Sequence, residues 1–243
     1  MAQTIQVDPG APAKSLPARL IGVLMTPRNA YAAVAARPRV LGALLVVALI
    51  SGLCIAAFSA TEVGKNAIFD QQRSSMESFG VQLNDAQLQQ MEARLRFAPY
   101  FGAVGQFVFL PVTALIIAGI AFAVFNAALG GDATFKQVYA IVVHSGVIVA
   151  VQQLFTLPLD YVRETLSSPT NLMVFLPFLE ENTFVARLLG TIDLFLIWWS
   201  ISLAIGLGVL YRKRTGPIAT TLLVVYVAIG LVIAAIKTAL AGA

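Results

Sequence analysis

The sequence predicts an all-α fold: a polytopic transmembrane helix bundle of five spans with an interfacial N-terminal amphipathic helix. Of its 243 residues, 58% are hydrophobic and only 12% are charged, whereas an ordinary soluble domain has roughly 25% charged residues. The mean hydropathy is +0.83. The apolar residues also gather in five long runs, each sufficient to cross about 30 Å of hydrocarbon as a helix.

These five runs define a predicted membrane domain of residues 40–243. They cover residues 40–61, 100–129, 138–159, 188–211 and 218–236. The second run contains Pro111, which removes one helical hydrogen bond and predicts a kink. Between the first two runs, Asn84 followed by Gln87 is typical of a capping box. We therefore expect a helix over 85–97, within a helical hairpin outside the membrane.

Two segments precede the first run. Residues 1–15 are polar and interrupted by Pro and Gly, so we expect a disordered tail. Residues 16–39 carry apolar residues at helical spacing with arginines between them, and Thr26-Pro27 is typical of a helix start. A segment of this kind is expected to lie in the lipid headgroup layer. A helix packed on the bundle is the alternative.

The basic residues predict how the chain is oriented. With the N-terminus inside, nine basic and two acidic residues face the cytoplasm, and seven basic residues share the other face with nine carboxylates. Positively charged loops stay in the cytoplasm, so we expect a cytoplasmic N-terminus and an external C-terminus. The residues expected to contact anionic headgroups on the cytoplasmic side are Arg19, Arg28, Arg37, Arg39, Arg212, Lys213 and Arg214.

Few polar residues lie inside the predicted spans. The candidates are Asn126, His144, Gln152, Gln153 and Asp193. Their positions along the spans place Asp193 level with the two glutamines, and His144 level with Asn126 and with Thr220-Thr221. His144 and Asp193 differ in depth by more than about 10 Å, which argues against a proton relay between them.

Two interpretations of Asp193 and His144 stay open. A carboxylate inside the membrane is a functional candidate by default, but a carboxylate near a helix N-terminus is also stabilised by the helix dipole. His144 suits either a neutral histidine that hydrogen-bonds across helices or a proton carrier.

The sequence offers little for catalysis. It contains no HExxH, GxSxG, Walker A or CxxC motif, and the single cysteine, Cys54, can form neither an intramolecular disulfide nor a cysteine-based metal site. We expect no enzymatic activity, no cofactor, no metal and no nucleic-acid partner.

Two stretches resemble the Yip family of multi-pass membrane proteins. The first is Leu16–Arg39, with Pro27 and Pro38, and the second is Ile192–Leu207. The other matching residues are Phe135-Lys136-Gln137, Asp193, Phe195, Trp198 and Ile205-Gly206-Leu207. The resemblance runs from about Leu16 to the C-terminus, and it implies five spans with a cytoplasmic N-terminus.

The resemblance implies a role as a membrane adaptor rather than an enzyme. Eukaryotic members are associated with vesicle traffic and prenylated Rab-type GTPases, whereas bacterial relatives generally have no assigned activity. The alanine- and arginine-rich composition indicates a bacterial protein of the cytoplasmic (inner) membrane, and the short N-terminal tail leaves little room to dock a GTPase. The trafficking role is therefore not transferred to this chain.

Two hypotheses follow for function. The first is a non-enzymatic membrane-organising or adaptor protein, with the lipid bilayer and either a membrane-protein partner or a second copy as its contacts. The alternative is a small transporter or channel subunit that uses His144, Gln152, Gln153 and Asp193.

Overall fold

A computed structural model of the chain describes residues 15–180 and 183–241. The described residues form helices and no β-strand, apart from an isolated bridge between Asn171 and Asp193. The predicted all-α fold is therefore confirmed, while all but the last residue of the predicted tail 1–15 lies outside the described residues. The chain forms two compact units. Unit 1 comprises Met1–Leu49, Phe107–Val151 and Trp198–Leu223, and unit 2 comprises Ile50–Gln106, Gln152–Ile197 and Val224–Ala243.

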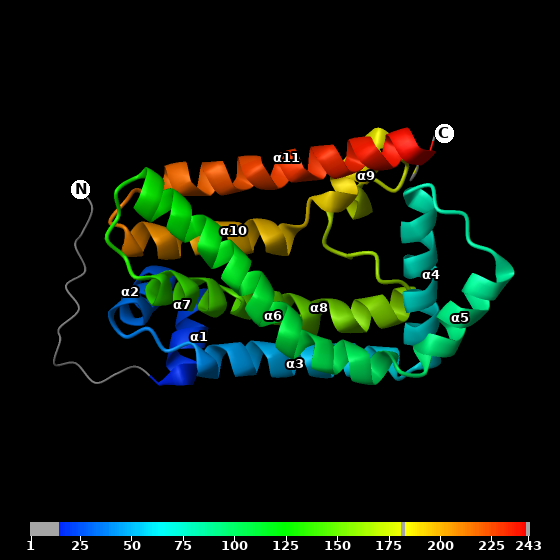
Figure 1. The fold of residues 1–243 in the computed structure, drawn as a ribbon, viewed down its shortest axis with the longest axis horizontal. Coiled ribbons are helices and arrows are strands. Elements are labelled where there is room, and N and C mark those ends of the chain that lie inside the picture. The colour runs from blue at the N-terminus through cyan, green and yellow to red at the C-terminus, as the bar shows by residue number, and fades with distance from the viewer. Residues whose placement is uncertain (1–14, 181–182, 242–243) are drawn as a thin grey trace. The chain divides into compact units, whose positions relative to one another are not determined.

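Four helical stretches in the described part of the chain are long and apolar enough to cross a bilayer (Figure 1). They are α3 (Leu41–Ser59), α6 (Ala98–Phe122) continued by the π-helix η1 (Ala123–Ala128), α7 (Phe135–Ser145) continued by α8 (Val147–Arg163), and α11 (Thr215–Ala241). These stretches correspond to the first, second, third and fifth predicted spans. Helix α6 runs through Pro111 without a break.

The predicted fourth span, 188–211, is wrong as one continuous helix. Helix α9 (Phe184–Thr191) ends before it, and α10 (Leu194–Leu210) begins only after Asp193. Between them the chain is extended, and the Leu172 N–H donates to the Ile192 carbonyl at 2.9 Å. The remaining α10 has 17 residues, at the lower limit of about 17 for crossing hydrocarbon.

In unit 1 the lead-in forms two short helices instead of one. Helix α1 (Leu16–Met25) packs against α2 (Pro27–Ala36), and both pack on α7. A helix does start at Pro27 as predicted, although the Thr26 side chain makes no capping hydrogen bond. The α2 face that carries Tyr31 is fully buried. This face has the packed arrangement given as the alternative to an interfacial helix.

Unit 2 contains the predicted hairpin, made of α4 (Glu62–Ser78) and α5 (Asp85–Leu95). The capping box is confirmed, because Asn84 Oδ1 accepts from the Gln87 N–H and the Gln87 side chain accepts from the Asn84 N–H, both at 2.9 Å. The short 3-10 helix η2 (Leu172–Phe175) packs on α9.

Candidate functional site

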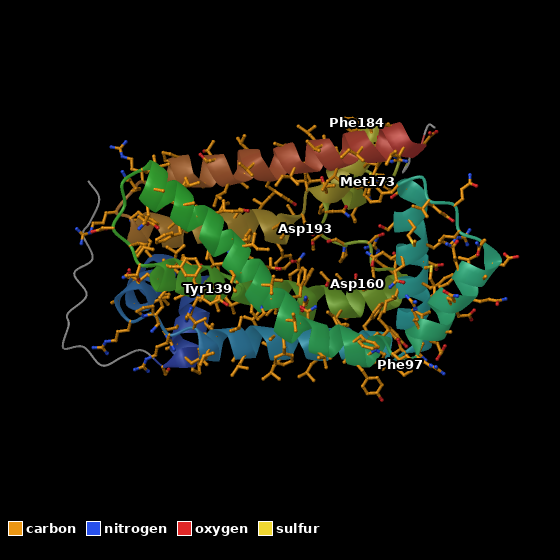
Figure 2. The ribbon with its side chains drawn as sticks, viewed as in Figure 1. Phe97, Tyr139, Asp160, Met173, Phe184 and Asp193 are labelled. Carbon is orange, nitrogen blue, oxygen red and sulfur yellow. The ribbon has the colours of Figure 1, made fainter. Side chains whose placement is uncertain are left out.

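Asp193 lies directly before α10 and caps it (Figure 2). Its side chain is among the buried polar groups of unit 2, with 5% of the residue exposed. Oδ1 accepts hydrogen bonds from the Phe195 N–H at 2.8 Å and the Leu196 N–H at 3.3 Å. It also accepts from Gln152 Nε2 on α8, at 3.1 Å. The carboxylate therefore satisfies two N–H groups that every helix leaves unpaired at its start.

The second carboxylate oxygen of Asp193 holds the loop that follows α8. Oδ2 accepts from Ser168 Oγ at 2.5 Å and from Thr170 Oγ1 at 2.7 Å. On the same side, the Leu194 N–H donates to the Thr170 carbonyl at 3.1 Å, which forms part of the isolated bridge. Five donors thus surround one carboxylate.

Tyr226 on α11 completes this cluster. Its hydroxyl accepts from the Asp193 N–H at 2.9 Å and donates to the Thr191 carbonyl at 2.5 Å. These two backbone groups lie between α9 and α10, so Tyr226 supports the break between those helices. We call Gln152, Ser168, Thr170, Asp193 and Tyr226 the Asp193 cluster.

The structure brings together only part of the site expected from the sequence. The expected pairing of Asp193 with Gln152 is present, but Gln153 Oε1 is buried without a hydrogen-bond partner among the described residues. Sequence reasoning missed Ser168, Thr170 and Tyr226. An aspartate inside an apolar run is itself a helix-capping signal, and the Ser-Ser-Pro-Thr stretch at 167–170 offered hydroxyl donors.

His144 does not have the neighbours expected from its depth. It is fully buried in unit 1, where Nδ1 lies 2.7 Å from the Ala140 carbonyl of its own helix. Nε2 has no hydrogen-bond partner in the described part of the chain. The expected partner, Asn126, instead donates to the Ala133 carbonyl at 2.7 Å and accepts from the Tyr211 hydroxyl at 2.6 Å. The expected pairing of His144 with Asn126 is therefore not among the hydrogen bonds of the described residues.

The residue after His144 provides the contact between helices in this region. Ser145 Oγ donates to the Val142 carbonyl at 2.7 Å and accepts from Trp199 Nε1 of α10 at 3.0 Å. In the same unit, the Tyr31 hydroxyl lies 2.8 Å from Ser202 Oγ. Burial raises the pKa of Tyr31, so this hydroxyl stays protonated.

Most of the arginines and lysines predicted to meet headgroups are exposed in unit 1. The exposed ones are Arg28, Arg37, Arg39, Arg212, Lys213 and Arg214. Arg19 differs, because only 8% of it is exposed and its Nε has no hydrogen-bond partner among the described residues. Burial, and then the nearby charge of Arg39, lower the pKa of Arg19.

No metal centre was found in the described ranges, where no group of three or more His, Cys, Asp and Glu side chains is placed to hold an ion.

Comparison with known proteins gives one match. The model of the Yip1 domain matches residues 21–236, a range that begins within α1, ends within α11 and includes the whole Asp193 cluster. No curated protein and no solved structure matches the chain. The resemblance seen in the sequence is confirmed by this match. Since the match covers far more than half of the chain, and several helices are long and apolar enough to span a bilayer, the chain is a multi-pass integral membrane protein that belongs to the Yip1 domain family.

Proposed function

We propose that this chain is a non-enzymatic membrane-organising or adaptor protein. The observation that carries the proposal is the Asp193 cluster, in which the two carboxylate oxygens accept five hydrogen bonds. A carboxylate that works on a substrate or a proton needs an oxygen free to reach it. Membership of the Yip1 domain family supports the same role.

The bilayer is the first partner in this proposal, with the N-terminus in the cytoplasm of a bacterial cell and the C-terminus outside. Unit 1 contains nine basic residues and two carboxylates, whereas unit 2 contains seven basic residues and ten carboxylates. Basic segments remain on the cytoplasmic side. Arg28 of α2, Arg37 and Arg39 just after it, and the Arg212–Arg214 turn, all exposed, then contact anionic headgroups, where each basic residue is worth about 1 kcal/mol.

A membrane-protein partner, or a second copy of the chain, is the other contact. The unit 1 part of α6 exposes large apolar side chains, among them Val108, Phe109 and Ile120. Gly119 on the same helix has no neighbouring atom within 4 Å of the position where a Cβ would stand. Lipid tails alone or a second helix would cover such a surface.

Gentle extraction tests the adaptor proposal. The full chain, extracted in lipid-retaining discs and purified, should carry a stoichiometric membrane-protein partner or a second copy, identified by mass spectrometry and cross-linking. A parallel extraction in harsh detergent controls for carry-over. Recovery of a monomer with lipid alone, in every disc preparation, would count against an adaptor.

A transporter or channel subunit is the second candidate, favoured by His144 Nε2 and Gln153 Oε1, which are buried without a hydrogen-bond partner among the described residues. Proteoliposomes screened for solute and proton flux test it directly. Flux that Asp193→Asn abolishes, and that the exposed-site control Asp132→Asn leaves intact, would overturn the adaptor proposal.

A further inference from the structure

Unit 2 contains a cavity of about 310 Å³ that the Asp193 cluster does not use. Ile55 and Phe58 of α3 and Ile68 of α4 contribute apolar side chains to its lining. Gln153 and Asp160 of α8 contribute polar ones. Such a mixture, mostly apolar with few polar groups, is typical of a small-molecule or lipid site.

Two buried oxygen atoms that line the cavity are acceptors without a donor among the described residues. Gln153 Oε1 and Asp160 Oδ1 are both buried without a hydrogen-bond partner in the described residues. Thr156, between them on the same helix, interacts with the Asp160 carboxylate. Among the described residues that line the cavity there is no lysine and no arginine. Because buried acceptors are normally paired, the cavity is suited to a ligand that donates hydrogen bonds.

Of the two acceptors, Asp160 is the one expected to bind a cation. Gln153 lies seven residues away, about 10 Å along α8, so one small cationic group reaches only one of the two. A carboxylate forms the stronger, charge-assisted bond. A metal ion would need several oxygen ligands, and the described residues contain no cluster of ligands for one. A protonated amine fits better, because it needs one carboxylate and brings its own donors.

Arg163, one turn beyond Asp160, supplies the opposite charge. Its side chain is exposed, and its Nη1 donates to the Ser167 carbonyl at 3.2 Å. It lies within electrostatic range of Asp160 but forms no ion pair with it within 4 Å. The end of this spanning helix therefore presents a carboxylate in a cavity and a guanidinium at the surface, a pattern complementary to a zwitterion.

We propose that this cavity binds the headgroup of an aminophospholipid such as phosphatidylethanolamine. The ammonium donates to Asp160 Oδ1, the phosphate lies toward Arg163, and the adjoining carbons pack on Ile55 and Phe58. This inference goes beyond the proposed function and does not depend on it, since an adaptor and a transporter would both tolerate such a site.

Cys54 makes the proposal measurable without any substitution. It is the only cysteine of the chain, it lines the cavity, and 7% of it is exposed. The delipidated full chain is placed in discs of phosphatidylethanolamine or phosphatidylcholine with identical acyl chains, and its modification by N-ethylmaleimide is timed. Phosphatidylethanolamine should slow the reaction about tenfold relative to phosphatidylcholine, whose trimethylammonium cannot donate the charge-assisted bond. Equal rates in the two lipids would overturn the proposal.

Three variants locate the interaction. Asp160→Asn should remove the difference between the two lipids. Glu164→Gln removes the same charge from an exposed position just past the end of α8, and Gln153→Leu removes the other orphan acceptor; both should retain the difference. A lipid preference that survives in Asp160→Asn would overturn the assignment. If that variant does not fold, the comparison on the native chain decides.

The source of the amine is tested separately. Soluble glycerophosphoethanolamine carries the same headgroup without acyl chains, so it should protect Cys54 far less than the intact lipid. Equal protection by the soluble compound would overturn the lipid assignment and identify a small amine as the ligand.

Discussion

Asp193 shows how a long apolar stretch of sequence can accommodate a carboxylate. Because its neighbours Ile192 and Leu194 are apolar, Asp193 hardly lowers the mean hydropathy of the stretch around it. Its five hydrogen bonds come from α8, α10 and the loop before η2. A buried charge is tolerated when its hydrogen-bonding capacity is filled, and here the same bonds start one helix and fix a loop.

Loss of the Asp193 carboxylate should therefore destabilise unit 2. Asp193→Ala leaves the donors of Ser168, Thr170 and Gln152 without their acceptor, at an expected cost of about 3 kcal/mol. Thermal unfolding in detergent, followed by circular dichroism, measures the loss. Glu180→Ala, an exposed site in the same unit, serves as the control and should change stability by less than about 0.5 kcal/mol. Equal melting temperatures for the two variants would contradict the structural role.

Gly206 on α10 is closely packed in unit 1. A Cβ at this position would lie 2.5 Å from Ile141 Cγ2 and 3.1 Å from Tyr31 Cδ1. Gly206→Ala should therefore cost about 1–3 kcal/mol through overpacking. Gly119→Ala is the matched control, because nothing lies within 4 Å of its Cβ position and the change should stabilise α6 by about 0.5–1 kcal/mol. Thermal melts that rank the two variants in the opposite order would refute this packing.

At the scale of elements, Gln137 joins the lead-in hairpin to the third spanning stretch. Its Oε1 accepts from the Thr134 N–H at 2.9 Å, completing a capping box, and its Nε2 donates to the Ala35 carbonyl at 3.0 Å. The same side chain thus starts α7 and pairs a carbonyl near the end of α2.

Removal of the Gln137 side chain should loosen α2. Gln137→Ala loses both interactions, worth about 1–2 kcal/mol together. Amide hydrogen exchange in α2 should accelerate accordingly, whereas the neighbouring exposed-site variant Lys136→Ala should leave it unchanged. Unaltered exchange in Gln137→Ala would show that apolar burial of Tyr31 and Val34 alone holds the hairpin.

The elements differ in how far the sequence could predict them. The capping box at Asn84 was predictable because its signal is local, two residues three positions apart. The break in the fourth span was missed because its causes, Thr170 and Tyr226, lie 23 and 33 residues from Asp193. The burial of Arg19 was missed for the same reason, since helical spacing identifies a face but not what covers it.

At the scale of the whole molecule, most of the basic residues belong to unit 1 and most of the carboxylates belong to unit 2. Eight of the nine basic residues of unit 1 are in the described part of the chain, together with one of its two carboxylates, Asp132. Composition and hydropathy were enough to predict the fold class and the membrane location. Composition and hydropathy could not predict which polar side chains form hydrogen bonds with each other, because the position of a residue along a span does not say which way its side chain points. His144 and Asn126 are the example, since each has other partners.

The separation of charge leads to a prediction about topology. After Cys54→Ala, single cysteines are introduced at four exposed sites: Gln82 and Ser167 in unit 2, and Asp132 and Lys213 in unit 1. A membrane-impermeant maleimide applied to intact cells should label the first pair only, and applied to inverted vesicles the second pair only, because basic segments are retained in the cytoplasm. The native chain provides the control, since its buried Cys54 should react with this reagent only after solubilisation in denaturing detergent. Labelling at positions 132 and 213 from outside intact cells would reverse the orientation, and Arg28 of α2 with the nearby Arg37 and Arg39 would then face the outer headgroups instead.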